Sequence, residues 1–272
     1  MAFPEGIAYD VRSGRLFTGS SVDGTLYEGL TADKELTILR PANYELSVAL
    51  GMGVSPDGQL YVMGGESGRL AVLDLDGSRA VTVKSPDPAP GDSSLLNDVA
   101  FDAEGTAYLT DSYRPVLFHY TRGESVTPWI DLQAAGVTYT DGFNLNGIVS
   151  TADGRFLLAV QSNTGTLYRI SLIDRIVDSI SVTGGTLHSG DGMALDNQEL
   201  FVALNRKNAV VRLLLDEEYR TASVEQTYRD GFLMPTAVAV TADSLYVVNA
   251  QLNRRGSSEG PQLPFSISRL PR

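Results

Sequence analysis

Six copies of one pattern recur along the chain, and this repetition restricts the fold more than any other feature of the sequence. In most copies a small residue near the start introduces alternating apolar residues, which lead into a turn and a second apolar stretch. The copies begin at Glu5, Met52, Asn97, Asn146, Asp191 and Thr236. They are spaced 47, 45, 49, 45 and 45 residues apart. A period of about 40–50 residues built from short strands is typical of the blades of a β-propeller.

Each copy predicts a hairpin, because alternation indicates strands and pairs such as Asp57-Gly58 and Asp153-Gly154 favour tight turns. A third strand follows in most copies, and a weaker fourth in some. The last copy offers three strands, at 237–241, 244–249 and 265–270. We therefore expect an all-β fold, a six-bladed β-propeller with four-stranded antiparallel blades around a central channel. It forms a single domain over residues 1–272.

Composition excludes several classes of function. The chain has no cysteine, which rules out disulfides and zinc–thiolate sites. Its net charge of −12 disfavours nucleic acid and anionic membranes as partners. No apolar run reaches the roughly 18 residues of a membrane-spanning helix, and the first residues do not form a signal peptide. The sequence thus predicts a cytoplasmic protein that binds a small-molecule substrate, and it leaves the oligomeric state open.

The residues that open the repeats carry the chemistry. The first strand of a blade lies along the channel, so these residues occupy equivalent places around one axis. Four of the six are carboxylates or carboxamides, namely Glu5, Asn97, Asn146 and Asp191. Two carboxylates in a narrow channel repel each other, and a bound cation removes that repulsion.

Oxygen ligands without histidine or cysteine suit a hard cation, and Ca²⁺ accepts six to eight oxygens in irregular geometry. We therefore predict a calcium site, with another divalent metal as the alternative. The same side chains could instead cap strands or form hydrogen bonds across the channel.

The four polar positions, each followed by a small residue or an aspartate, resemble the regucalcin and gluconolactonase family of six-bladed propellers, the senescence marker protein-like family. The resemblance covers the whole chain and implies that Glu5, Asn146 and Asp191 bind the metal directly. It implies that Asn97 is a fourth ligand or orients the substrate. It also implies that Asp191 acts catalytically, as base or nucleophile.

Two departures place the sequence in a divergent branch of that family. Sugar-lactone hydrolases of the family carry an arginine two residues before the channel asparagine, where this chain has Leu95. A leucine cannot bind sugar hydroxyls, so a less polar substrate is expected. Ile7 and Tyr9 also replace the usual proline and tryptophan after the first glutamate.

Loops between the second and third strands of each blade should surround the channel mouth. They place Tyr113, Asn163 and Asn205 as substrate contacts beside Leu95. His188 precedes Asp191 by three residues and is either a general base or a locally hydrogen-bonded loop residue. Segment 251–264 is polar and rich in Gly, Ser and Pro, which predicts either a lid or a surface insertion. Loops 86–91 and 138–143 are expected to wall the mouth.

Three functions remain open at this stage. The first is a metal-dependent hydrolase of a lactone, an ester or a related electrophile. The second is a cyclase, lyase or isomerase that uses the same metal site in a biosynthetic pathway, since a fold does not fix its chemistry. The third is a binding propeller without catalysis.

Overall fold

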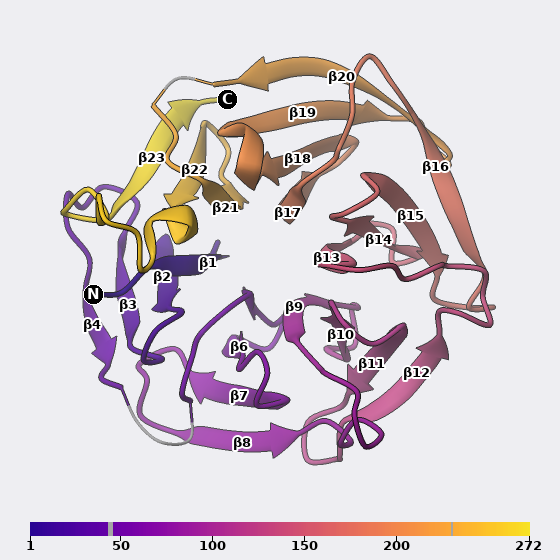
Figure 1. Ribbon diagram of the computed structural model, residues 1–272, viewed down its shortest axis with the longest axis horizontal. Coiled ribbons are helices and arrows are strands. Elements are labelled where there is room, and N and C mark those ends of the chain that lie inside the picture. Colours follow the sequence, from indigo (N-terminus) through magenta and orange to yellow (C-terminus); the bar gives the residue numbers. More distant parts are fainter. Residues whose placement is uncertain (43–45, 230) are drawn as a thin grey trace.

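The chain forms a ring of antiparallel sheets, seen face-on in the computed structural model (Figure 1). The structure describes residues 1–42, 46–229 and 231–272. Within these residues the strands form five hydrogen-bonded sheets, three with four strands, one with three and one with eight. The eight-stranded sheet consists of two antiparallel units whose outer strands pair in parallel, at 181–183 and 221–223. Counted this way, the described strands make six units.

The first three units have four strands each. Unit one contains β1 (Pro4–Asp10), β2 (Arg15–Ser20), β3 (Leu26–Leu30) and β4 (Thr37–Arg40). Unit two contains β5 (Met52–Val54), β6 (Gln59–Met63), β7 (Arg69–Asp74) and β8 (Ala80–Lys84). Unit three contains β9 (Leu96–Phe101), β10 (Ala107–Asp111), β11 (Val116–Tyr120) and β12 (Thr127–Asp131).

The other three units include two short 3₁₀ helices. Unit four contains β13 (Leu145–Ser150), β14 (Phe156–Gln161), β15 (Thr166–Ser171) and β16 (Val177–Thr183). Unit five contains β17 (Gly190–Asp196), β18 (Glu199–Leu204), η1 (Asn205–Lys207), β19 (Ala209–Leu215) and β20 (Thr221–Tyr228). Unit six contains β21 (Pro235–Val240), β22 (Ser244–Asn249), η2 (Leu252–Arg254) and β23 (Ser266–Pro271). No helix among the described residues has the length and hydrophobicity needed to cross a membrane.

The prediction of an all-β propeller is confirmed. Each predicted repeat begins in the innermost strand of a unit, and β1, β9, β13, β17 and β21 surround the centre of the ring (Figure 1). The last unit has three strands in the described residues, as its sequence predicts.

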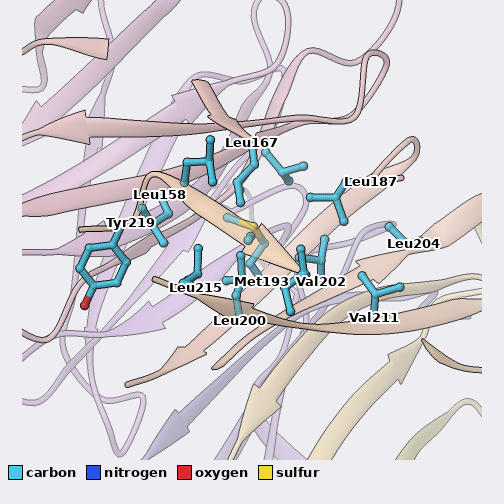
Figure 2. Close-up of a cluster of buried hydrophobic side chains, with 14 of the residues drawn as sticks. Leu158, Leu167, Leu187, Met193, Leu200, Val202, Leu204, Val211, Leu215 and Tyr219 are labelled. Carbon is cyan, nitrogen blue, oxygen red and sulfur yellow. The ribbon is translucent and has the colours of Figure 1, made fainter. Parts of the chain in front are cut away.

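The hydrophobic core lies between neighbouring units. One cluster joins Leu158 of β14 and Leu167 of β15 to Met193 of β17 and Val202 of β18, all of them buried (Figure 2). Alternation along a strand places side chains on both faces of a sheet, so apolar residues on both faces make each unit pack against two neighbours. The inner strands are therefore held by two packed interfaces each.

The ring closes between the first and last units. The hydroxyl of Thr236 in β21 donates a hydrogen bond of 2.7 Å to the carbonyl oxygen of Glu5 in β1. Tyr246 of β22 likewise donates from its hydroxyl to the carbonyl oxygen of Thr31 at 3.1 Å. The last unit thus contacts the backbone of Glu5 directly.

Candidate metal and substrate site

An irregularity recurs at the same place in the inner strands. In β1 the pairing with β2 shifts between Pro4 and Ile7, so Glu5 and Gly6 together face a single residue. This is a β-bulge, a feature that re-aims side chains and is common beside active sites. Corresponding shifts occur in β9, β13, β17 and β21. The first bulge position is held by Glu5, Asn97, Asn146, Asp191 and Thr236.

The prediction that Met52 opens the second repeat is wrong by two residues. Met52 pairs with Val62, which is the register position that Ile7 holds opposite Thr18. The two residues before it span the bulge, because the amide of Leu50 donates to Met63 and the amide of Met63 donates to Gly51, each at 2.9 Å. Leu50 therefore holds the first bulge position of unit two. The six residues at the first bulge positions surround the channel and are called the ring residues.

The second bulge position is small in five units, where it is held by Gly6, Gly51, Gly147, Gly192 and Ala237. The next unit leaves no room there, since a Cβ on Gly147 would lie 2.3 Å from the carbonyl oxygen of Asp191. Unit three has Asp98 instead, and its Oδ2 accepts a hydrogen bond of 3.1 Å from the amide of Ile148. Asp98 is not among the site residues predicted from the sequence.

Two cavities meet at the four predicted ligands. One, of about 550 Å³, is lined by the inner strands, and the other, of about 1150 Å³, is lined mainly by loops at the channel mouth. Glu5, Asn97, Asn146 and Asp191 line both cavities, so they lie where the mouth narrows into the channel. Each is at most 8% exposed. Asp98 lines only the inner cavity.

The three carboxylates at the bulges have pKa values well above their ordinary ones. Burial raises the pKa of Glu5 well above its ordinary value, and the charges of Asp191 and Asp98 raise it further. Burial also raises the pKa of Asp191 to about 7, despite hydrogen bonds from Asn205 and Asn146 that lower it. Burial similarly raises the pKa of Asp98 to about 7, against the lowering effect of the Val99 and Ile148 amides. Among the residues that the structure describes, no basic side chain is a cause that lowers the pKa of these three carboxylates.

Glu5 has an oxygen that the protein leaves without a partner. Its Oε2 is buried, and no hydrogen-bond partner for it lies among residues 1–42, 46–229 and 231–272. An unpaired buried carboxylate oxygen is costly, and a cation coordinated there removes the cost.

The described part of the chain contains no group of three or more His, Cys, Asp or Glu side chains placed to hold a metal ion. A cation at the ring must therefore take asparagine oxygens as well as carboxylates. Such a mixed oxygen set fits a hard cation.

Hydrogen bonds fix which end of the Asn97 amide faces the cavities. The single hydroxyl proton of Ser112 is donated to the carbonyl oxygen of Leu145 at 2.7 Å. Its Oγ therefore accepts from Asn97, whose Nδ2 lies 2.8 Å away. The nitrogen of Asn97 is thus used in the wall, which leaves Oδ1 as the atom available to a ligand.

Asn205 is oriented in a similar way towards Asp191. Its Oδ1 accepts a hydrogen bond of 2.6 Å from the amide of Arg206. Its Nδ2 then donates to Oδ2 of Asp191 at 2.7 Å. Asn205, predicted as a substrate contact, lines the mouth cavity and also holds the predicted catalytic carboxylate.

All five predicted substrate contacts line the mouth cavity, and they are Leu95, Tyr113, Asn163, His188 and Asn205. His188 is exposed, and its Nδ1 lies 3.0 Å from the carbonyl oxygen of Asn163, which belongs to another loop. Their roles with a substrate remain predictions.

Two of the loop predictions match the cavity wall and one does not. Phe143 of the 138–143 loop lines the mouth cavity, whereas loop 86–91 does not. In segment 251–264, Leu252, Asn253 and Arg255 belong to the cavity wall. Gln251 anchors the segment, since its Nε2 donates to the Gln262 carbonyl at 2.9 Å and its Oε1 accepts from the Gln262 amide at 2.8 Å.

Fold and site together define a β-propeller whose channel presents oxygen-bearing side chains from several units to a cavity. Residues 3–251 match the family described as the SMP-30/Gluconolactonase/LRE-like region. The chain belongs to this family, which includes enzymes and agrees with the predicted resemblance. A search of curated proteins finds no match.

Solved structures share the fold at low sequence identity. Regucalcin of Agrobacterium tumefaciens, a calcium-binding protein, is 19% identical, with 99% of this chain and 90% of that chain covered and a TM-score of 0.68. The allergen Mala s 1 of Malassezia sympodialis is 14% identical over 98% of this chain and 92% of its own, at a TM-score of 0.74. Virginiamycin B lyase of Staphylococcus aureus is 12% identical over 91% and 92%, at a TM-score of 0.61.

Proposed function

We propose that the protein is a divalent-cation-dependent hydrolase of a lactone, an ester or a related electrophile, and that it acts where the mouth cavity narrows. The observation that carries the proposal is the buried Oε2 of Glu5, which lacks a partner in the described residues. The charge of Asp191 raises the pKa of Glu5 further. A structural ring would be expected to pair these groups, whereas a cation site must leave their oxygens free.

Four residues would hold the cation, namely Glu5, Asn97, Asn146 and Asp191. They supply two carboxylates and two amides, and Ca²⁺ suits such a set because it accepts several oxygens in irregular geometry. The family match and the likeness to a calcium-binding regucalcin support this choice. Magnesium or manganese is the alternative.

When bound, the cation would polarise the carbonyl of the substrate and stabilise negative charge on its oxygen. Asp191 would accept a proton from water, and Asn205 orients its carboxylate for this step by donating to Oδ2. The hydroxide so formed adds to the carbonyl carbon, the bond to the leaving oxygen breaks, and that oxygen takes the proton from Asp191. Asn97 holds its Oδ1 towards the same space.

Metal content and thermal stability, measured with and without a chelator, test the site first. About one calcium per chain is expected, with a melting temperature that falls on chelation because a cation bound only by the folded state stabilises it. Asp191→Ala should abolish this response, whereas Asp92→Ala, in an exposed loop, should keep it. No bound metal and no response to calcium would remove the mechanism and favour a binding propeller.

A panel of lactones and esters then tests hydrolysis. The holoprotein is expected to cleave at least one of them, and Asp191→Ala is expected to be inactive. If calcium binds but no member of the panel is cleaved, the metal site stands and the hydrolase is rejected.

A lyase or isomerase on the same site is the second candidate. The ring position of unit two holds Leu50, and Leu95 lies beside it in the mouth cavity, which suits an apolar substrate. A virginiamycin B lyase shares the fold, although the identity of 12% carries no chemistry by itself. Reaction in ¹⁸O-labelled water separates the candidates, because hydrolysis places the label in a product and elimination or isomerisation does not.

A further inference from the structure

The mouth cavity has an apolar side formed by units two and three. Three side chains meet around Gly65, where an added Cβ would lie 3.0 Å from Leu50, 3.2 Å from Val48 and 3.5 Å from Leu95. All three line the cavity. They therefore form one continuous apolar surface beside the predicted metal ligands.

Two aromatic rings extend this apolar side. Tyr113 and Phe143 lie with ring centroids 5.6 Å apart and planes tilted by 34°, and both line the cavity. Phe143 is 42% exposed, so a large apolar area faces the cavity and solvent. An aromatic or branched alkyl group of a ligand would remove this area from water, which favours binding.

The opposite side of the cavity is polar and carries two cations. Arg206 of η1 and Arg255, which follows η2, belong to the neighbouring units five and six, and both line the cavity. The short coils near β18 and β1 in Figure 1 show where these segments lie at the mouth. Neither arginine forms an ion pair with a carboxylate within the described residues, while the adjacent Arg254 pairs with Glu259 at 3.7 Å.

Acidic side chains, in contrast, lie on the apolar side of the cavity. Glu66 and Asp141 line that part of the cavity, and the Glu66 charge adds to burial in raising the pKa of Tyr113. Away from the narrowing where Glu5 and Asp191 lie, the mouth is therefore polarised, with negative charge beside the apolar surface and positive charge across from it. An anionic group on a ligand is attracted to one side and repelled from the other.

We infer that the substrate is a bulky amphiphile, with an aromatic or branched alkyl group on one side of the reacting carbonyl and an anionic group on the other. The apolar group would lie against Leu50, Leu95 and Phe143, and the anionic group against Arg206 and Arg255. The cavity of about 1150 Å³ exceeds the roughly 300–1000 Å³ of ordinary small-molecule pockets, which supports a bulky ligand. The reacting carbonyl in this inference rests on the proposed function. The two binding sides do not, because they follow from the residues of the cavity wall.

A matched pair of fluorescent probes tests the binding sides without any turnover. 8-Anilinonaphthalene-1-sulfonate carries a sulfonate that N-phenyl-1-naphthylamine lacks. The double variant Arg206→Gln/Arg255→Gln should lose about tenfold in affinity for the sulfonate probe, the combined effect of two exposed ion pairs, and little for the neutral probe. Arg79→Gln removes an exposed charge in unit two, away from the cavity lining, and should change neither affinity.

The apolar side has its own matched pair of variants. Phe143→Ala should weaken binding of the neutral probe by about fivefold, since a large side chain in contact with a ligand is lost. Ile173→Ala changes an 88% exposed residue that does not line the cavity and should leave binding unchanged. Thermal melting of each variant shows that a loss of binding is not a loss of folding.

A matched pair of substrates links the inference to turnover. A phenyl-substituted lactone with a carboxylate side chain should be cleaved with a kcat/KM about tenfold above that of its carboxamide, mainly through KM, and the double arginine variant should remove the difference. If neither lactone is cleaved but the probes behave as expected, only the proposed hydrolysis fails. If the ratio of probe affinities in the double variant equals that in Arg79→Gln, the amphiphile inference is wrong.

Discussion

Two buried carboxylates, Asp111 behind the ring and Glu5 within it, are treated in opposite ways. Asp111 is fully buried, and its Oδ1 accepts hydrogen bonds of 2.9 Å from the amides of Leu95, Tyr113 and Arg114. Its Oδ2 accepts from Ser94 and from the guanidinium of Arg114, at 2.6 and 2.8 Å. Glu5 is 8% exposed and has an oxygen without a partner in the described chain.

This difference distinguishes a buried carboxylate that stabilises the fold from one that is available for function. A buried carboxylate that serves the fold is neutralised and hydrogen-bonded, because an unsatisfied one destabilises the protein. The Asp111–Arg114 cluster meets this rule and fixes the backbone of two cavity residues, Leu95 and Tyr113. Within the ring Glu5 breaks this rule, and such local exceptions are expected at functional sites.

Among the variants that test this comparison, Asp191→Asn has the largest expected effect. If the ring serves function, activity should fall by about 10²–10⁴-fold, the usual contribution of a general base. In chelated protein the same change should not lower the melting temperature, because burial of the charged Asp191 carboxylate costs more than its hydrogen bonds from Asn205 and Asn146 recover. Kinetics and calorimetry of the holo- and chelated protein check this, with Asp92→Asn as the exposed control. A destabilised apoprotein would show that Asp191 serves the fold instead.

The opposite result is expected for Asp111→Asn. Removing one partner of a buried ion pair leaves the Arg114 charge uncompensated, which costs about 3–5 kcal/mol of unfolding free energy. The control Asp87→Asn breaks an ion pair with Lys84 in which both side chains are more than half exposed, and it should cost at most about 1 kcal/mol. Urea unfolding measures both. Equal costs would mean that the Asp111 cluster does not stabilise the protein as argued.

The spacing of the repeats predicted the propeller and four of the ring residues, because both depend on position along the chain. Glu5, Asn97, Asn146 and Asp191 recur at the blade period and occupy equivalent bulges. The second repeat was misaligned because Gly51 and Gly53 offer two registers, and only the hydrogen bonds of Met63 select the one that places Leu50 in the ring.

Other parts of the site depend on contacts between distant residues and had no signal in a single sequence. Asn205 reaches Asp191 across a strand pair, and Ser112 fixes the amide of Asn97 from the neighbouring strand. Asp98 is an exception, because it was visible as the one large residue at a position that is otherwise Gly or Ala. A comparison of the second bulge position across the repeats would have found it.

Gly51→Ala tests whether activity depends on the spacing of the inner strands that carry the ring residues. The new Cβ would lie 2.3 Å from the Asn97 carbonyl oxygen and 2.5 Å from an oxygen of Asp98, so the inner strands must separate. We expect a loss of about 1–3 kcal/mol in unfolding free energy and a loss of activity. Gly105→Ala, at φ +87° with open space around it, should strain only its turn and leave activity unchanged. Equal activities of the two variants would mean that the spacing of the ring does not matter.

The smallest expected effect concerns Tyr61, deep in the apolar core of unit two and away from the ring. Burial raises its pKa to about 12, and its ring packs edge-on against Phe101 at 4.9 Å. The folded state therefore keeps the proton that the unfolded state loses above about pH 10, so stability falls as the pH rises from about 10 to 12. Tyr61→Phe should lack this part of the loss, about 1.4 kcal/mol at pH 11 relative to pH 8. Urea unfolding of both proteins at the two pH values measures it, and equal losses would place the alkaline sensitivity elsewhere in the fold.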